Sequence, residues 1–301
     1  MRVELRPPRL EEATALARVL GEFAQAYGSD HEPQSDIEGW FTSPGMDLEH
    51  DARVALADGE IVGYGDVRDP GGKGSAVDLD LRFHPDHPEV VEPLAGFAEK
   101  RAHELVKPGG TIRAWSTETA EPLLRQIGER GFTFSNYSLQ MGMSLNGDLP
   151  EPEWPEDIEL RPSDRIDARR VYEVSQETFE DTPGHVRDPY EEWAHWALRE
   201  PFDPEFWFLA FDGGELAGTC LCRPYHGDDQ DCGWVHALGV RRPWRRRGLG
   251  LALLRHALLR LRAHGNTRAG LGVHARNPAV TLYERAGMNV LRTSLWFHKE
   301  V

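Results

Sequence analysis

The chain has 301 residues, of which 40% are hydrophobic, and it carries a net charge of −16 and three cysteines. The length predicts two domains, and the charge repels nucleic acid and anionic membranes. No stretch is long and apolar enough to span a bilayer, and the N-terminus lacks the apolar core of a signal peptide. We therefore expect a cytoplasmic protein without nucleic-acid or membrane partners.

The three cysteines, Cys220, Cys222 and Cys232, are too few for a disulfide framework and fit a reducing compartment. A zinc site that includes His226 and His236 can be drawn around them, but the paired spacing typical of zinc-binding cysteines is missing. Cys220 and Cys222 lie in a strand-like run, where cysteine is a common small core residue. The sequence therefore predicts no metal site.

The two halves of the chain repeat one pattern. Three widely spaced anchors return after 155 or 156 residues: Val3–Pro7 as Ile158–Pro162, Asp58–Gly63 as Gly213–Gly218, and Glu129–Phe132 as Arg285–Met288. A common offset predicts tandem copies of one domain. Prolines and acidic residues between positions 146 and 155 predict a stiff, solvated linker, so we expect domains at residues 1–148 and 149–301.

Strands alternate with helices along the second copy. In chain order, the predicted elements are the strand Ile158–Pro162, the helix Asp167–Phe179, a hairpin of Phe206–Phe211 and Leu216–Cys222, the strand Cys232–Val240, the helix Leu249–Ala263, the strand Ala269–Ala275, the helix Ala279–Ala286 and the last strands within Val290–His298. The periodicity of the apolar residues supports this order. It predicts an α/β fold, α+β in some schemes, with a sheet covered by helices.

A glycine- and arginine-rich loop joins the predicted strand that ends at Val240 to the next helix. Its core is Arg245-Arg246-Arg247-Gly248-Leu249-Gly250. Glycine lets the backbone approach a ligand closely, and free N–H groups at a helix N-terminus point toward an anion. A solvated face or a nucleic-acid patch is the alternative, but the chain is otherwise acidic. The loop is typical of a phosphate or pyrophosphate site.

This loop resembles the acyl-CoA pyrophosphate loop of the GNAT acyltransferase superfamily, and Leu282–Met288 is similar to that family's Leu-Tyr-x-x-x-Gly-Phe motif. The resemblance covers most of residues 158–299 and is faint in the first half. It implies two tandem GNAT-type domains, each a mixed sheet flanked by helices, with two splayed strands and acetyl-CoA as acyl donor. The implied donor-site residues are Leu238, Gly239, Val240, Arg245, Arg246, Arg247, Gly248, Leu249, Gly250, Asn277 and Tyr283. Asn277 stands six positions before Tyr283 instead of the seven usual in the family, which puts its role in doubt.

The resemblance implies that Tyr283 donates a proton to the departing CoA thiolate. A core tyrosine is the alternative. His236 is the candidate general base, because His236–Val240 is similar to a strand of the arylalkylamine N-acetyltransferases and because histidine titrates near neutral pH. Strict alternation would place His236 on one face of the strand with Leu238 and Val240. A packed core histidine is the competing interpretation.

The acceptor is expected near the segment that follows the first helix of the second copy. There, Glu177, Glu180 and Asp181 stand among aromatic residues. Carboxylates mixed with aromatic rings suit a cation attached to an apolar body. We predict that these three residues bind a small amine; a solvated amphipathic helix is the alternative.

The first copy lacks the chemistry. Its equivalent loop, Phe83–Gly96, has acids and prolines in place of the glycine pair, and Ile127 stands where the second copy has Tyr283. Proline removes an N–H donor, and carboxylates repel pyrophosphate. The first domain is therefore predicted to be a degenerate GNAT-like copy that shapes the structure or the substrate site.

The sequence predicts an N-acetyltransferase that moves an acetyl group to a small amine by direct attack. A mycothiol-synthase-like enzyme is a second interpretation, since that family also resembles a tandem; its strand glutamate is replaced here by Trp234. A non-catalytic acyl-CoA sensor or interaction module is the alternative from another class, and a nucleic-acid binder is disfavoured by charge. The acceptor, the length of the acyl group and the oligomeric state stay open.

Overall fold

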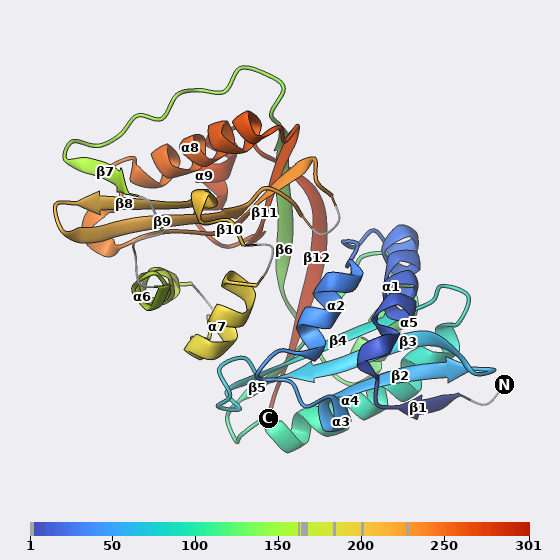
Figure 1. The fold of residues 1–301 in the computed structure, drawn as a ribbon. Coiled ribbons are helices and arrows are strands. Elements are labelled where there is room, and N and C mark those ends of the chain that lie inside the picture. The colour runs from blue at the N-terminus through green and yellow to red at the C-terminus, as the bar shows by residue number, and fades with distance from the viewer. Residues whose placement is uncertain (1–2, 162, 164–167, 183–184, 200–201, 227–228) are drawn as a thin grey trace. The chain divides into compact units, whose positions relative to one another are not determined.

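The computed structural model describes residues 3–161, 163, 168–182, 185–199, 202–226 and 229–301. The chain forms two compact units: unit 1 is Met1–Ser138 with Arg292–Val301, and unit 2 is Leu139–Leu291. Each unit has a mixed sheet with helices on both faces, which confirms the α/β class and the tandem organisation (Figure 1). The proposed boundary between residues 148 and 149 stays a prediction.

Unit 1 contains β1 (Glu4–Arg6), α1 (Ala13–Tyr27), α2 (Gln34–Phe41), α3 (Leu48–Asp51), β2 (Ala52–Ala57), β3 (Glu60–Arg68), β4 (Ala76–Phe83), α4 (Val91–Leu105), β5 (Thr111–Thr117) and α5 (Glu121–Glu129). It also holds the first half of β6 (Thr133–Ser144) and most of β12 (Asn289–Glu300). The strand order is β1-β2-β3-β4-β5-β12-β6, and β4 and β5 are parallel. Helices α1 and α2 cover one face, and α4 and α5 cover the other.

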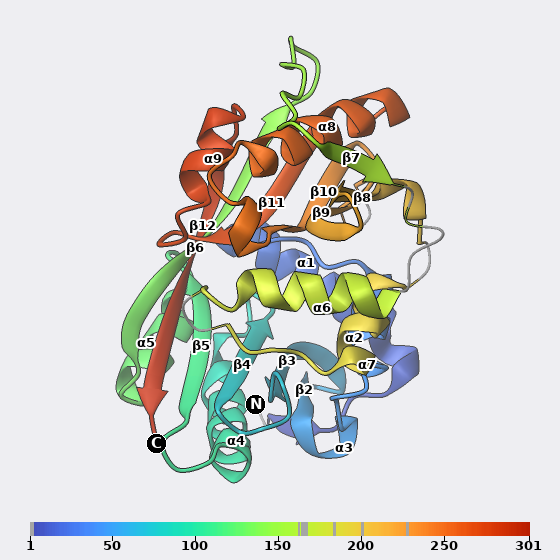
Figure 2. The same ribbon diagram turned by 90° about the vertical axis from the view of Figure 1, so that its left-hand side faces the viewer.

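Unit 2 contains β7 (Ile158–Arg161), α6 (Ala168–Phe179), α7 (Tyr190–Ala197), β8 (Trp207–Asp212), β9 (Glu215–Arg223), β10 (Cys232–Val240), α8 (Leu249–His264), β11 (Arg268–His274) and α9 (Val280–Arg285). Its strand order, with the second half of β6, is β6-β11-β10-β9-β8-β7. Helices α8 and α9 pack on one face of this sheet, and α6 and α7 lie on the other (Figure 2).

The two copies share a local irregularity as well as an order of elements. The β2–β3 hairpin shifts register between Ala55 and Leu56, and the β8–β9 hairpin does so between Ala210 and Phe211. These positions differ by the same 155 residues that separate the sequence anchors. A β-bulge at the same place in both hairpins is independent support for a tandem repeat, because bulges are specific local features rather than defects.

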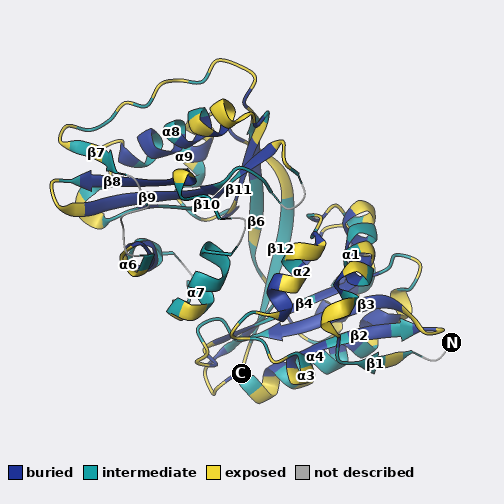
Figure 3. Cartoon of the chain, viewed as in Figure 1, coloured by how far each residue is buried: buried dark blue, intermediate teal, exposed yellow. Residues whose placement is uncertain are grey.

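Helix α8 shows how the sequence positions the site. Its apolar residues recur at helical spacing and are buried in the core of unit 2, whereas its charged residues lie on the other face, as the colouring in Figure 3 shows. Gly265, at φ +118°, ends the helix in the left-handed conformation, and its N–H donates to the carbonyl of Arg262. Glycine adopts this conformation without strain. The C-terminal end of the helix is therefore closed by Gly265, and its apolar face anchors it on the sheet.

Two sequence expectations need correction. A single strand, β12, replaces the expected last strands of the second copy; residues 294–300 pair with β5 of unit 1. The linker is packed rather than fully solvated, because Leu149 and Trp154 contact the core beneath α8, and the Trp154 ring lies 5.8 Å from that of His256. Pro162 and Asp167, predicted to end a strand and to begin a helix, lie outside the described residues.

None of the helices in the described part of the chain has the length and apolar character needed to cross a membrane.

Candidate active site

Strands β10 and β11 separate in unit 2. They pair in parallel from Cys232 and Arg268 to Trp234 and Gly270, and their hydrogen-bonded register ends there. Both strands continue, to Val240 and His274. Backbone groups of the second half of β10 on this edge are therefore not used by the sheet, and polar backbone groups of this kind need another partner. This is the splay that the family resemblance implies for the pantetheine arm.

A β-bulge at His236 starts this separation. Val235 pairs with Cys222 and Ala237 pairs with Leu221, so that His236 is the extra residue without a partner on β9. A bulge bends its strand and re-aims side chains. The His236 side chain is exposed, in contrast to its buried neighbour Val235.

The bulge also overturns the expected alternation. Val235, Leu238 and Val240 all contact the core beneath α8, although an unbroken strand would send Val235 to the opposite face. Ala237 instead packs on the α6 side. The strict alternation that would place His236 on one face with Leu238 and Val240 is therefore broken by one inserted residue, at His236 itself.

His236 does not titrate near neutral pH. Desolvation by neighbouring protein atoms lowers the pKa of His236 to about 3 although the residue is exposed, and Arg223, His226 and Arg199 add positive charge. The imidazole is therefore neutral at physiological pH. It can accept a hydrogen bond, but the expectation of a pKa near 7 is not met.

The loop before α8 presents a row of free amides. Arg246 has φ +61° and Gly248 has φ +88°, so the backbone turns twice through the left-handed region. The N–H of Ala252 donates to Gly248, whereas the amides of residues 246–251 donate to no backbone carbonyl among the described residues. Successive N–H groups in such a turn form an anion-binding concavity, and the positive end of a 16-residue helix adds to it. These groups fit a pyrophosphate.

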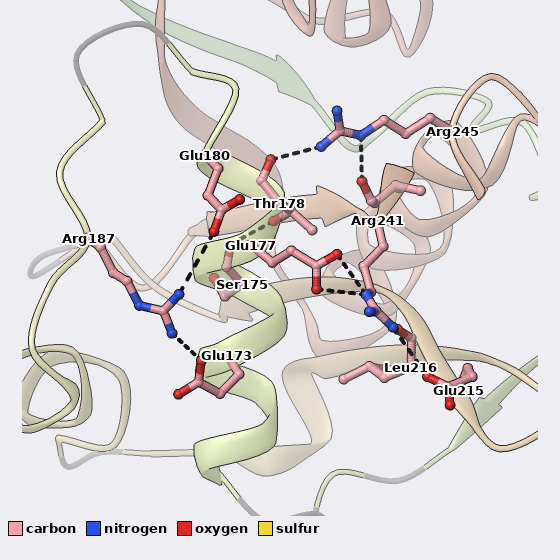
Figure 4. A network of polar contacts seen from close by, with 11 residues as sticks. Glu173, Ser175, Glu177, Thr178, Glu180, Arg187, Glu215, Leu216, Arg241 and Arg245 are labelled. Carbon is pink, nitrogen blue, oxygen red and sulfur yellow. Dashed lines mark hydrogen bonds and ion pairs between the residues drawn. The ribbon is translucent and has the colours of Figure 1, made fainter. Parts of the chain in front are cut away.

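Three of the loop's arginines are engaged with α6 and its C-terminal turn, and Figure 4 shows two of them, Arg241 and Arg245. Arg245 donates to Val240 O (2.8 Å), Thr178 O (3.2 Å) and Asp181 (2.6 Å). Arg242 donates to both oxygens of Asp181. Arg241 donates from Nε to both oxygens of Glu177, at 2.9 and 3.0 Å.

The carboxylates expected to bind the acceptor are therefore paired already. Glu177 contacts Arg241, and Asp181 contacts Arg242 and Arg245. Glu180 lies 4.0 Å from Arg187. Hydrogen bonds from Arg242 and Arg245 hold the pKa of Asp181 well below its usual range. Their acceptor-binding role stays a prediction, and each would have to exchange an arginine for the amine.

Tyr283 lies on α9, close to this loop. A Cβ added to Gly250 would lie 3.0 Å from the Leu282 side chain, so the glycine lets α9 approach the first turn of α8. Tyr283 is only 7% exposed, and burial, together with the nearby Cys220, raises its pKa to about 12. The phenol therefore keeps its proton at neutral pH, as a general acid must.

Asn277 has a local structural role. Its Oδ1 accepts a hydrogen bond from the N–H of Ala279 at 2.9 Å, in the turn that leads into α9. Such caps satisfy backbone donors at helix starts. Its predicted part in donor binding is untested.

The equivalent loop of unit 1 is closed. The N–H of Val90 donates to His87, and the N–H of Val91 donates to Pro88. Ile127 is buried in the core of unit 1 at the position of Tyr283. Two amides of this loop are therefore bonded within it, and an isoleucine stands where unit 2 has its proton donor.

Sequence reasoning missed the bulge and the contacts between α6 and the loop. No sequence pattern predicts the bulge, because Val235 and Ala237 on either side of His236 are both apolar, as in a regular strand. The contacts have no local signal either, because Asp181 lies beyond the end of α6 at Phe179 and the arginines stand about 60 positions later in the chain.

Known proteins resemble this chain in sequence and in fold. A sequence model of the Acetyltransferase (GNAT) family matches residues 168–288. A mycothiol acetyltransferase from Streptomyces scabiei is 30% identical over 99% of this chain and 96% of its own. The crystal structure of a GCN5-related N-acetyltransferase from Sphaerobacter thermophilus has a TM-score of 0.80 at 28% identity, covering 99% of this chain and 95% of its own. A tandem GNAT protein from the clavulanic acid biosynthesis pathway shares the fold, with a TM-score of 0.74 at 16% identity over 99% and 98% of the chains.

Two tandem units, one of which has free loop amides, splayed strands and a protonated tyrosine, define an acyl-CoA-dependent acyltransferase. The chain belongs to the GNAT acetyltransferase family and is an N-acetyltransferase. Members of this family generally use acetyl-CoA.

Proposed function

We propose that unit 2 transfers the acetyl group of acetyl-CoA to the amine of a small molecule by direct attack. The observation that supports this most is the combination, within one unit, of unpaired amides at residues 246–251 with the splay of β10 from β11. The first suits a pyrophosphate, and the second leaves strand backbone groups free for the amides of a pantetheine arm.

The side chains that we assign to the chemistry are Tyr283 and His236. The amine nitrogen forms a bond to the acetyl carbon, the carbon–sulfur bond breaks, and the phenol of Tyr283 protonates the sulfur. Neutral His236 accepts a hydrogen bond from the amine. It can take the amine's proton after the carbon–nitrogen bond has formed, when that nitrogen is a far stronger acid.

A small-molecule acceptor is supported by the relatives named mycothiol acetyltransferase. We do not extend their acceptor to this chain, because Trp234 stands where the resemblance to the mycothiol-synthase family implies a glutamate. Its ring stacks on His226 with centroids 3.7 Å apart. An indole cannot accept a proton from an amine, so the acceptor side differs at this position.

A screen of amines, amino acids, peptides and amine antibiotics with acetyl-CoA, read by release of free thiol, tests the proposal. We expect turnover of at least one small amine. CoA binding without turnover of any amine would favour the sensor. Absence of CoA binding would overturn the proposal altogether.

A further inference from the structure

The arginine-rich loop carries more positive charge than it can present to a ligand. It contains five arginines, at positions 241, 242, 245, 246 and 247. Three of them make ion pairs with Glu177, Asp181 and Glu215. The side chains of Arg246 and Arg247 are exposed and form no ion pair with the described residues. The loop therefore retains two uncompensated positive charges, enough to match the two negative charges of a pyrophosphate.

The paired arginines converge on one end of α6. Helix α6 ends at Phe179, so the carbonyl of Thr178 is among those left without an intrahelical partner. Arg245 donates to this carbonyl (Figure 4). It also donates to Asp181, which follows the helix. Cations at a helix C-terminus interact favourably with its dipole. Arg245 is thus held at the C-terminal end of α6 by a side-chain carboxylate, a main-chain carbonyl and the helix dipole.

A close contact with β10 supports the same arrangement. The side chain of Thr178 lies against Gly239, where any added Cβ would clash. Helix α6 is thereby held on the strand that leads into the loop, and Arg245 also donates back to Val240 of that strand. Strand, helix end and loop form one hydrogen-bonded unit, which fixes the loop backbone.

We infer that Asp181 and Glu177 are positioning residues for the donor site. With Arg241, Arg242 and Arg245 they form a clamp that holds the loop amides in place for the pyrophosphate. Charged contact with phosphate is left to Arg246 and Arg247. The clamp deepens the proposed function, since it assumes that the loop binds the CoA pyrophosphate.

Replacing Asp181 distinguishes a positioning role from a simple effect of its charge, because the two predict changes of opposite sign in the affinity for CoA. If the carboxylate acts only through its charge, Asp181→Asn removes a repulsive group and tightens CoA binding. If it positions the loop, the loss of hydrogen bonds to two guanidinium groups weakens CoA binding, by about ten-fold. The control is Glu173→Gln, which removes one negative charge from α6 at a residue that contacts Arg187 instead of the loop.

Calorimetric titration with CoA measures this without turnover. We expect about ten-fold weaker binding for Asp181→Asn and no more than about two-fold change for Glu173→Gln. Adding Arg245→Gln to Asp181→Asn should cost less than the two single effects together, because the residues act through each other. Unchanged or tighter CoA binding in Asp181→Asn overturns the clamp. The clamp is also overturned if Asp181→Asn raises the KM for the acceptor and leaves the CoA affinity as it was. If the wild-type chain fails to bind CoA, the proposed function fails instead.

Discussion

Replacing Tyr283 by phenylalanine removes the proposed proton donor and little else. The ring is buried in the core beneath α8, and its hydroxyl makes no hydrogen bond with a described residue, so phenylalanine fills the same space. We expect the free energy of unfolding to change by less than about 1 kcal/mol. A change in activity therefore reports on the missing proton.

The pKa decides how large that change is. Tyr283 has a pKa raised to about 12, whereas a thiol such as that of CoA has a pKa of about 8.5. Proton transfer to the thiolate is then uphill by roughly 5 kcal/mol, and more so before the carbon–sulfur bond has fully broken, because the sulfur is less basic at that stage. The phenol therefore helps mainly by donating a hydrogen bond to the departing sulfur. A weak acid of this kind contributes at the lower end of the usual range, which predicts a fall in kcat of about 10²-fold, or about 2.7 kcal/mol.

The assay combines thiol release at saturating acetyl-CoA with calorimetric CoA affinity and a thermal melt. CoA affinity and Tm should stay close to those of the wild type. Tyr137→Phe makes the same chemical change at an exposed residue of unit 1 and should leave kcat unaltered. A normal kcat in a folded Tyr283→Phe variant would refute the reasoning and show that water protonates the sulfur.

Further changes probe the rest of the site. Calorimetry should give one CoA per chain, and Gly248→Asp should abolish binding because it adds charge and a left-handed non-glycine residue; two equal sites would contradict this. The folded chain resists protonation of His236 between about pH 6.5 and 3, whereas the unfolded chain accepts it, so stability falls as pH drops through that window. His236→Gln should accordingly show a smaller loss of Tm between pH 7 and 5, and an equal loss would show that His236 does not set this acid sensitivity. Gly239→Ala should lower Tm and CoA affinity together, because the added methyl group would clash with the Thr178 side chain. Unchanged Tm and CoA affinity would show that α6 can move away from the strand.

Much of unit 2 could be predicted because its signals are local. The strand Cys232–Val240 follows from its apolar run, and α8 begins at Leu249 because glycine precedes a long apolar repeat. The tandem organisation follows from the shared offset. Each of these features depends on neighbouring residues, which a sequence displays directly.

Other features depend on partners far away in the chain. The bulge at His236 is visible only from the register with β9. Residues 294–300 pair with β5, more than half the chain away, and no local pattern selects that partner. Glu177 and Asp181 show as acidic residues near aromatic ones, and the sequence does not reveal that arginines some 60 positions later compensate them.

The two copies differ where the catalytic copy departs from regular structure. In unit 2, β10 has a bulge, Arg246 has a positive φ, and loop amides lack backbone acceptors. A non-glycine residue in a strained backbone conformation costs about 1–3 kcal/mol of folding stability, and an unpaired backbone amide lowers the stability further. In unit 1, β4 pairs with β3 without a register shift, and the amides of Val90 and Val91 in the equivalent loop are bonded within it. A copy that need not hold a ligand has no reason to keep such strain, and unit 1 has kept the regular arrangement at each place. The irregularities of unit 2 therefore mark the donor site more directly than the glycines alone, since glycine also serves ordinary turns in both units.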